Sequence, residues 1–400
     1  MYLKQLIKKS WPGMYRQLQA AKKKWSSENP GAGTASGAFK PYHAKMLHAP
    51  GKDRKKVLHV IGNFWTGGSA RIVIDLFEHM GHCYEQEILT RDIPPVPAYT
   101  GIDIHLCTEW ENIEPVVVHL KRFNPDLIHV HFLGHHRDAW GEGDWQWYHN
   151  FFKAAATYDC PIIQNINIPT EPYTSESVNA YVYVSDYVKR EFSNPLHRNL
   201  VIYPGSDFTH FSRQDDTLPD DCIGMVYRLE RDKINEASIE VFIETVKNRE
   251  GTRAVIVGGG NLLQHYRDRV AAEGLADSFT FTGYVAYEDL PRYYKKMSVF
   301  VAPVHRESFG QVTPFAMSMG LPVAGYRVGA LPEIIADDSL LAPPGDIKKL
   351  SKVLIELLDN KERRNQVGIQ NNQRAKELFS VEAMIESYKD IYGELTSKRS

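Results

Sequence analysis

The sequence predicts an α/β protein with two doubly wound, parallel-sheet domains that face each other across a cleft. Its 400 residues exceed the usual size of one domain, which is about 100 to 200 residues. Short apolar runs alternate with helical patterns along the chain, and this order builds a parallel sheet covered by helices. Glycine-rich loops follow several of the apolar runs, as they do where such sheets bind small molecules.

The composition predicts a soluble globular chain. Hydrophobic residues make up 43% and charged residues 24%, and the net charge of −2 gives no overall attraction to nucleic acid. The four cysteines lie far apart without a C-x-x-C pair, which argues against a disulfide framework and a cysteine-rich zinc site. No apolar run of about 18 residues and no secretory leader is evident. We therefore expect a cytoplasmic protein.

The charge is uneven at the N-terminus. Residues 1–25 contain seven lysines or arginines and no acidic residue, interleaved with leucines, tryptophans and tyrosines. This basic amphipathic segment is typical either of a peripheral contact with an anionic membrane surface or of a solvated tail, and both readings stay open. Residues 26–54 are rich in glycine, alanine and serine and predict a flexible linker.

The predicted first domain spans residues 55–206. It starts with an apolar strand at 57–61, a loop with Gly67 and Gly68, and a helix at 70–80 whose apolar residues recur at helical spacing. Further strands are predicted at 102–106, 127–131, 161–166, 181–184 and 200–202, with a helix at 115–123. A crossover is expected near residues 203–207.

The predicted second domain spans residues 207–380 and repeats this alternation of strands and helices. Strands are predicted at 223–227, 254–257, 279–281 and 299–301, and helices at 234–246, 262–273, 290–296, 347–358 and 361–378. A last amphipathic helix is expected within 381–400 and closes the chain.

Four loops of the second domain carry side chains suited to a charged ligand. Arg228 and Lys233 follow a strand, where two cations can hold a diphosphate. Gly258, Gly259 and Gly260 follow the next strand and offer backbone N–H groups to an anion. Tyr284 and Val285 follow Gly283 and can border a base, and Glu307 can accept hydrogen bonds from sugar hydroxyls. Each feature alone is more often a surface charge or a turn, but ligands bind where strands of such sheets end.

In this order the motifs resemble the retaining, GT-B fold glycosyltransferases of family 4. The matching stretches are Tyr227-Arg228-Leu229-x-x-x-Lys233, Val257-Gly258-Gly-Gly260, Thr282-Gly283-Tyr284, Glu307-Ser-Phe-Gly310, Gly320-Leu-Pro-Val323 and Gly329-Ala-Leu-Pro-Glu333. The first half adds Gly67-Gly68 before a helix and Val201-Ile-Tyr-Pro-Gly205-Ser-Asp207 at the crossover. The resemblance covers about residue 55 to the C-terminus and implies two Rossmann-like domains.

The resemblance also implies a donor site and a reaction. Arg228 and Lys233 hold the donor diphosphate and Glu307 holds the transferred hexose, so these three are the predicted catalytic residues. The other predicted donor-binding residues are Gly67, Gly68, Gly258, Gly259, Tyr284, Val285, Ser308, Phe309, Gly310, Gln311 and Val312. The implied reaction transfers a hexose from a nucleotide diphosphate sugar, with a UDP-sugar favoured, retains the anomeric configuration and uses no cofactor and no obligatory metal.

Two positions depart from the family pattern. Phe315 stands eight residues after Glu307, where the family has a second glutamate for the ribose; either another group holds the ribose, or the ring packs in the core. Asn167 stands where the family usually has a histidine that contacts the donor sugar. One interpretation is a divergent active transferase, which we favour because Arg228, Lys233 and Glu307 remain. The other is a protein that binds a sugar nucleotide or a partner without turnover.

A second cluster lies in the first half of the chain. His131, His135 and Asp138 are of metal-ligand type, but loop histidines at this density are more often polar contacts, so we expect no metal. Tryptophans nearby favour an acceptor surface made by His131, His135, Asp138 and Asn167, with Glu142 and Asp144 as further candidates.

The sequence therefore predicts a cytoplasmic or peripheral-membrane hexosyltransferase that acts on a saccharide or lipid-linked acceptor in cell-surface glycan assembly. A non-catalytic sugar-nucleotide binding or scaffold protein stays an alternative, as does a sugar-nucleotide epimerase or phosphorylase on the same fold. The sequence does not predict the oligomeric state.

Overall fold

The computed structural model describes residues 42–64, 67–93, 99–108, 112–134, 142–195, 197–212 and 218–397. The predicted basic segment 1–25, most of the predicted linker, and the positions of His135 and Asp138 lie outside this part of the chain. Within the described residues, no helix has the length and apolar character needed to cross a membrane.

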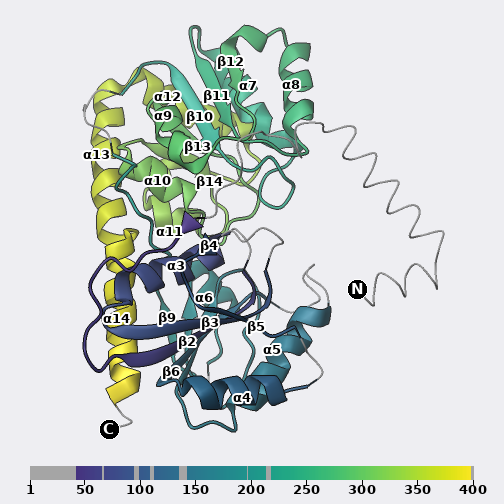
Figure 1. The fold of residues 1–400 in the computed structure, drawn as a ribbon. Coiled ribbons are helices and arrows are strands. Elements are labelled where there is room, and N and C mark those ends of the chain that lie inside the picture. Colours follow the sequence, from purple (N-terminus) through teal and green to yellow (C-terminus); the bar gives the residue numbers. More distant parts are fainter. Residues whose placement is uncertain are drawn as a thin grey trace, which may run out of the picture. The chain divides into compact units, whose positions relative to one another are not determined.

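The first sheet has seven parallel strands in the order β5-β3-β2-β6-β7-β8-β9 (Figure 1). The strands are β2 (Lys55–Asn63), β3 (Tyr84–Asp92), β5 (Ile104–Leu106), β6 (Leu127–Phe132), β7 (Ile162–Ile166), β8 (Val178–Tyr183) and β9 (Asn199–Val201). The central strand β6 is buried at all six positions, as expected of a parallel strand covered on both faces.

Four helices connect these strands. They are α3 (Gly68–Met80), α4 (Glu114–Phe123), α5 (Glu142–Ala155) and α6 (Asp186–Phe192); two short strands, β1 (Tyr42–His43) and β4 (Tyr99–Thr100), complete this half. Helix α4 ends at Asn124, which takes the left-handed conformation with φ of 53°, a common way to end a helix. Helix α6 begins at Ser185, whose hydroxyl accepts a hydrogen bond from the Val188 N–H.

The second sheet has six parallel strands in the order β12-β11-β10-β13-β14-β15. They are β10 (Cys222–Val226), β11 (Arg253–Val257), β12 (Phe279–Phe281), β13 (Val299–Ala302), β14 (Val323–Tyr326) and β15 (Leu341–Ala342). Its α-helices are α7 (Glu240–Asn248), α8 (Leu263–Ala272), α9 (Leu290–Tyr294), α10 (Val312–Ser318), α11 (Leu331–Ile335), α12 (Ile347–Asp359) and α13 (Lys361–Leu378). Four short 3₁₀ turns lie at Glu236–Ile239, Ala276–Ser278, Tyr287–Asp289 and Asp338–Leu340.

The last helix, α14 (Val381–Ser397), packs on the first sheet although it follows the second domain in sequence. Its Met384, Tyr388 and Tyr392 join one apolar cluster with Val57 of β2 and Leu76 of α3. Figure 1 shows this helix in yellow beside the strands of the first sheet. The C-terminal helix thus completes the core of the first domain.

Two elements of the first domain differ from the sequence prediction. Strand β3 was not predicted because Glu85, Gln86 and Glu87 interrupt its apolar residues, yet β3 pairs with β2 over most of its length. The Trp-rich stretch expected to contribute to an acceptor surface contains a helix that was not predicted, α5, whose Trp147, Tyr148 and Phe151 are buried. Both misreadings have one cause, since polar residues inside an element hid its periodicity.

Candidate functional site

The four predicted loops meet at the carboxyl edge of the second sheet. The strands that precede them, β12, β11, β10 and β13, are direct neighbours. Backbone hydrogen bonds tie loop to loop: Gly258 N–H donates to Gly283 O (3.1 Å), Leu229 N–H to Gly259 O (2.9 Å) and His305 N–H to Lys233 O (2.9 Å). This edge is where open α/β sheets bind ligands.

Lys233 and Glu307 form the central contact of the site. The Lys233 Nζ lies 2.7 Å from Glu307 Oε1. The Glu307 side chain is completely buried, whereas the Lys233 side chain is 37% exposed. The second carboxylate oxygen, Glu307 Oε2, is buried without a hydrogen-bond partner in the protein. A buried carboxylate oxygen without a donor is costly, so this atom is suited to accept hydroxyl groups of a ligand.

Two glycines make room for Glu307. Gly310 has a φ of +79°, and a Cβ there would lie 2.4 Å from Glu307 Oε2. Gly329 has a φ of +55°, and a Cβ there would lie 1.9 Å from the Glu307 carbonyl oxygen. Any other residue at either position would clash and would be strained. The Glu-Ser-Phe-Gly motif and the distant Gly329 therefore hold one carboxylate in one place.

Tyr227 borders this carboxylate. Burial raises the pKa of the Tyr227 hydroxyl well above its ordinary value, and the negative charge of Glu307 raises it further. The phenol therefore stays protonated next to the carboxylate.

Arg228 lies at the predicted loop but points elsewhere. Its guanidinium forms an ion pair of 2.6 Å with Asp232, and its side chain is 69% exposed. The structure thus joins Lys233 to Glu307 directly and leaves Arg228 in an exposed pair with a different partner, from which a long arginine side chain can swing to a ligand.

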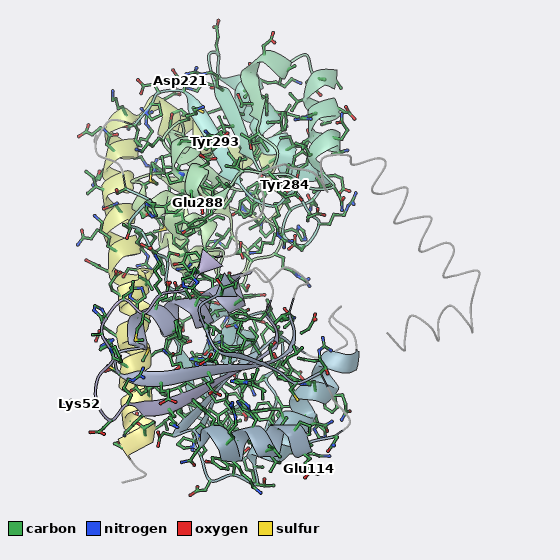
Figure 2. All side chains as sticks on the ribbon, viewed as in Figure 1. Lys52, Glu114, Asp221, Tyr284, Glu288 and Tyr293 are labelled. Carbon is green, nitrogen blue, oxygen red and sulfur yellow. The ribbon has the colours of Figure 1, made fainter. Side chains whose placement is uncertain are left out.

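The glycine loop and the predicted base-binding residues come together. A Cβ at Gly259 would lie 2.6 Å from the Tyr284 ring, so this ring lies close against the glycine backbone. Tyr284 is 72% exposed and is labelled in Figure 2, while Val285 packs at the margin of the apolar core. An exposed aromatic face beside a glycine loop is a platform on which a base can stack.

Helix α3 of the first domain meets the start of α10 in the second. A Cβ on Gly68 would lie 3.8 Å from Gln311 Oε1, and Gln311 Nε2 donates to the Gly205 carbonyl at 3.2 Å. Gly67 has open space around its Cα. The predicted residues Gly68 and Gln311 are therefore neighbours although they come from different domains.

The remaining donor-site predictions fall on the loop around Glu307. Phe309 is buried and stacks on Tyr203, with ring centroids 5.8 Å apart. Val312 begins α10, and its carbonyl accepts a hydrogen bond from Tyr294. Ser308 is half-buried between Glu307 and Phe309. The contacts of Phe309 and Val312 anchor the loop that carries Glu307.

Phe315 packs in an aromatic cluster. Its ring stacks on Phe211 with centroids 4.1 Å apart and lies edge-on to Phe208 and Tyr287. Of the two alternatives that the sequence left open, the packed ring is the one observed. A hydrophobic contact thus stands at the position where the sequence resemblance implies a ribose-binding carboxylate.

Asn167 follows the end of β7 and is buried. Its Oδ1 accepts a long hydrogen bond of 3.4 Å from Asn165 Nδ2, while its own Nδ2 is buried without a partner in the protein. An unpaired amide donor at the carboxyl end of a strand is suited to a ligand oxygen.

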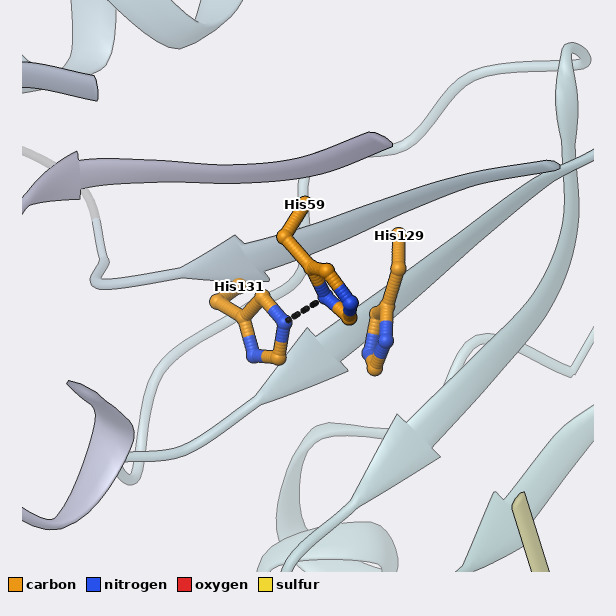
Figure 3. Close-up of side chains that lie close together, drawn as sticks. All are labelled: His59, His129 and His131. Atoms are coloured by element: carbon orange, nitrogen blue, oxygen red, sulfur yellow. Dashed lines mark hydrogen bonds between the residues drawn. The ribbon is translucent and has the colours of Figure 1, made fainter. Parts of the chain in front are cut away.

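His131 ends the predicted strand 127–131, as expected, but its predicted place on an acceptor surface is wrong. His131 lies inside β6 and is fully buried, and its Nε2 is 3.2 Å from His59 Nδ1. Figure 3 shows the two rings next to His129. The alternation of His129 and His131 along the strand places both side chains on the covered face. Glu142 and Asp144 begin helix α5; their side chains and those of His135 and Asp138 lie outside the described set.

The sequence missed two further charged groups. Glu333 of α11 accepts hydrogen bonds from the N–H groups of Asp186 and Tyr187, at 2.8 and 3.0 Å, and from the Tyr203 hydroxyl at 3.1 Å. It thereby ties the second domain to the start of α6. Asp75 of α3 is buried and pairs with Arg71 at 2.5 Å. Its spacing of four residues from Arg71 was the available signal.

This chain resembles one sequence family over part of its length and several solved structures over most of it. Residues 209–374 match the model of the family described as "Glycosyl transferases group 1". The sucrose-phosphate synthase of Thermosynechococcus elongatus superposes with a TM-score of 0.66 at 18% identity and covers 86% of this chain and all of its own. HepE of Anabaena, solved in complex with UDP, gives a TM-score of 0.68 at 16% identity and covers 85% of this chain and all of its own. These neighbours share the GT-B fold.

Curated relatives match over shorter stretches. An uncharacterised glycosyltransferase of Methanocaldococcus jannaschii is 25% identical over 227 residues, which is 56% of this chain and 62% of the relative. The 2-deoxystreptamine N-acetyl-D-glucosaminyltransferase of Streptomyces fradiae is 36% identical over 115 residues, which is 28% of this chain and 27% of the relative. The chain therefore matches from about a quarter to three fifths of these two relatives' lengths.

Proposed function

We propose that this protein is a retaining glycosyltransferase that moves a hexose-type sugar from a nucleotide diphosphate sugar to a saccharide or lipid-linked acceptor. The observation that carries this proposal is the Lys233–Glu307 pair. One carboxylate oxygen is bound to a cation, and the other is buried, unpaired and held at the carboxyl edge of the sheet. Donor hydroxyls can satisfy this oxygen, while the ammonium group of Lys233 faces the diphosphate.

The reaction needs positive charge where the leaving group forms. The bond between the sugar C1 and the β-phosphate oxygen breaks, and C1 forms a bond to the acceptor oxygen on the same face. The departing phosphate takes the acceptor proton, so no protein base is needed. Lys233 and Arg228 stabilise the charge that develops on the diphosphate, which fits a reaction without an obligatory metal. Arg228 leaves its exposed pair with Asp232 to do so.

A UDP-sugar is the proposed donor. HepE, which shares the fold, has been solved with UDP and with UDP-glucose. The exposed Tyr284 ring against Gly259 offers the base a stacking surface. The ribose then lies beside Phe315 rather than a carboxylate, so backbone groups or the first domain hold its hydroxyls.

A cell-surface glycan or its lipid-linked precursor is the proposed acceptor. Two of the partial relatives are named as a lipopolysaccharide core mannosyltransferase of Rhizobium meliloti and an O-antigen chain mannosyltransferase of Escherichia coli. The basic residues 1–25 suit a peripheral position on an anionic leaflet. Deletion of this segment is expected to weaken binding to anionic vesicles and to leave activity on a soluble acceptor unchanged.

The test is a donor screen followed by a transfer assay. We expect one class of UDP-, GDP-, ADP- or TDP-sugars to raise the unfolding temperature; a ligand at 100 times its Kd contributes about 2.7 kcal/mol. The stabilising sugar nucleotide is then incubated with candidate acceptors, and the anomeric configuration of the product is read by NMR. Donor binding without any transfer would favour a non-catalytic binding protein, and conversion of the donor without an acceptor would favour an epimerase.

A further inference from the structure

A cluster of metal-ligand side chains lies on the first sheet, in a different domain from Glu307. Glu87 comes from β3, His105 from the edge strand β5, and His119 from α4. Leu89 of β3 pairs with His105 of β5, so Glu87, two residues earlier than Leu89, points to the same face as His105. Helix α4 brings His119 and Arg122, three residues apart, to this face.

The three potential ligands converge. Glu87 Oε2 lies 3.1 Å from His105 Nε2 and 3.3 Å from His119 Nε2. The two imidazole rings have centroids 4.6 Å apart, and one ligand atom of each residue lies within 4.8 Å of the other two. Four-coordinate zinc with bonds of about 2.0 to 2.1 Å needs ligand atoms roughly 3.3 Å apart. Two of the three separations, 3.1 and 3.3 Å, are already close to this value.

One cation of the protein now faces these ligands. Arg122 Nη2 lies 3.0 Å from Glu87 Oε2, 3.2 Å from His105 Nε2 and 3.4 Å from His119 Nδ1. Arginine only donates hydrogen bonds, so His105 Nε2 and His119 Nδ1 present lone pairs to it. A neutral His119 then carries its proton on Nε2, and metal binding through Nε2 moves that proton to Nδ1 once Arg122 has left. A single Nη2 has two hydrogens, so it cannot serve all three acceptors. The cluster has more acceptors than its cation can serve.

His119, the most buried residue of the cluster, is suited to bind a metal. His119 has a side chain that is 9% exposed. Its Nε2 is buried and forms no hydrogen bond, although Glu87 Oε2 lies 3.3 Å away.

We propose that Glu87, His105 and His119 form a binding site for a divalent transition metal, with Zn²⁺ as its ion, and that Arg122 occupies the cation position when the metal is not bound. The set of two imidazoles and one carboxylate is a known zinc donor set, with water as the fourth ligand. Arg122 can leave because its side chain is 55% exposed. The metal joins edge strand β5 and helix α4 to β3, which is a stabilising role.

The described residues contain a second histidine cluster, which is less suited to a metal. His59, His129 and His131 are all fully buried, and no carboxylate belongs to the set. A dication there would be an uncompensated charge in the core, which costs several kcal/mol or more. Most of these ring nitrogens also have partners: His59 Nε2 is 3.0 Å from Gln86 Oε1, and His129 Nδ1 is 2.6 Å from the Tyr392 hydroxyl, whereas His131 Nδ1 has none. The Glu87 cluster has the charge and the access that this cluster lacks.

The test measures Zn²⁺ binding to the full chain by calorimetry after removal of bound metal with a chelator. We expect one site, a loss of at least 10-fold in affinity for Glu87→Gln and for His105→Ala, and a gain of about 10-fold for Arg122→Met, because the competing cation is removed. Methionine keeps the unbranched apolar stem of the side chain without its charge, and the exposed position makes this variant safe for folding. His265→Ala, an exposed histidine on α8, is the control and should leave the affinity unchanged.

The Arg122→Met variant distinguishes a metal-binding site from a cluster of ion pairs that only stabilises the fold. If Arg122→Met leaves Zn²⁺ affinity the same or lowers it, the proposed exchange of arginine for metal is wrong. Zn²⁺ binding that survives both Glu87→Gln and His105→Ala would also overturn the site and place the ion on other histidines. Co²⁺ in place of Zn²⁺ gives an independent reading, since its visible absorption reports tetrahedral coordination in the parent and should vanish in His105→Ala.

Discussion

Lys233 Nζ and Glu307 Oε1 lie 2.7 Å apart although 74 residues separate them in sequence. Strand β10 delivers the lysine and the neighbouring strand β13 delivers the glutamate, and the His305 N–H bond to the Lys233 carbonyl fixes the two loops to each other. Only Lys233 reaches solvent. The pair thus presents a cation outward and an unpaired carboxylate oxygen inward.

Replacement of Glu307 by glutamine is expected to lower kcat/KM for donor turnover by about 100- to 1,000-fold, the usual effect of removing one group that stabilises a transition state. Glutamine keeps the size of the side chain but removes the charge that pairs with Lys233. Lys233→Ala should lower kcat by a similar factor. Initial rates with the donor found in the screen provide the measurement.

The matched control for these variants is Arg231→Ala. Arg231 lies on the same loop as Lys233 but pairs with Glu236 at the surface. An exposed pair contributes little to stability, so activity and unfolding temperature should stay near those of the parent. Full activity of both Glu307→Gln and Lys233→Ala would show that the catalytic site lies elsewhere.

Phe315→Glu, which introduces the carboxylate that the sequence resemblance implies at this position, is expected to destabilise the protein by about 3 to 5 kcal/mol, since it removes a packed aromatic ring and buries a charge. The ring of Phe211 would lose its stacking partner. Phe315→Leu keeps an apolar side chain and should cost less. Chemical unfolding of both variants measures the difference.

A gain of nucleotide affinity in Phe315→Glu without loss of stability would contradict this account. It would mean that the aromatic cluster can open and that the glutamate reaches the ribose. Titration with UDP by calorimetry distinguishes the two results.

Much of the second domain could be predicted from sequence because its motifs act locally. Val257 ends a strand, Gly258 begins a turn, and Glu307 precedes Gly310, whose positive φ favours glycine. Each of these signals is visible within a few residues of sequence. The meeting of these loops followed from the rule that parallel strands end at one edge. The fold class was confirmed for the same reason.

The parts that could not be predicted depend on contacts between distant segments. Phe315 gave no sign that Phe211 would stack on it, and Glu333 gave no sign that it would bind the start of α6. The predicted strand 127–131 already includes His131, but nothing in the sequence indicated that β6 pairs with β2 and β7 on its two sides and that this side chain is fully buried. The surroundings of these residues depend on tertiary contacts with segments that lie far from each motif in the sequence.

Glu333→Gln is expected to loosen the start of α6. The carboxylate accepts two backbone N–H groups and the Tyr203 hydroxyl, and hydrogen bonds to a charged acceptor contribute about 1.5 to 3 kcal/mol. Burial also raises the pKa of Glu333, and the backbone donors oppose that shift. Hydrogen exchange of the Asp186 and Tyr187 amides should speed up in the variant. Asp338→Asn, another carboxylate of the second domain that pairs with Arg327 at the surface, is the control and should leave these amides unchanged.

His59→Gln is expected to change how stability depends on pH. Burial lowers the pKa of His59 to about 4 from 6.5, and its hydrogen bond to Gln86 opposes this shift. The unfolded chain therefore binds the proton more tightly, so the stability that a neutral His59 contributes is present above pH 6.5 and is lost as the pH falls toward 4. The slope approaches about 1.4 kcal/mol per pH unit for one proton. The unfolding free energy of His59→Gln should lack this dependence on pH.

Asp75→Asn is expected to change the dependence of stability on pH in the opposite direction, over an overlapping pH range. Burial raises the pKa of Asp75 to about 7 from 3.8, and Arg71 opposes the shift. Here the folded chain binds the proton more tightly, so the contribution of Asp75 is complete below pH 3.8 and is lost as the pH rises to about 7. The unfolding free energy of the parent minus that of Asp75→Asn should fall between pH 5 and 7, whereas the same difference for His59→Gln should rise. Urea unfolding at three pH values measures both differences. A difference for Asp75→Asn that stays flat between pH 5 and 7 would show that Asp75 stays ionised beside Arg71 throughout this range, and the ion pair would then be a permanent part of α3.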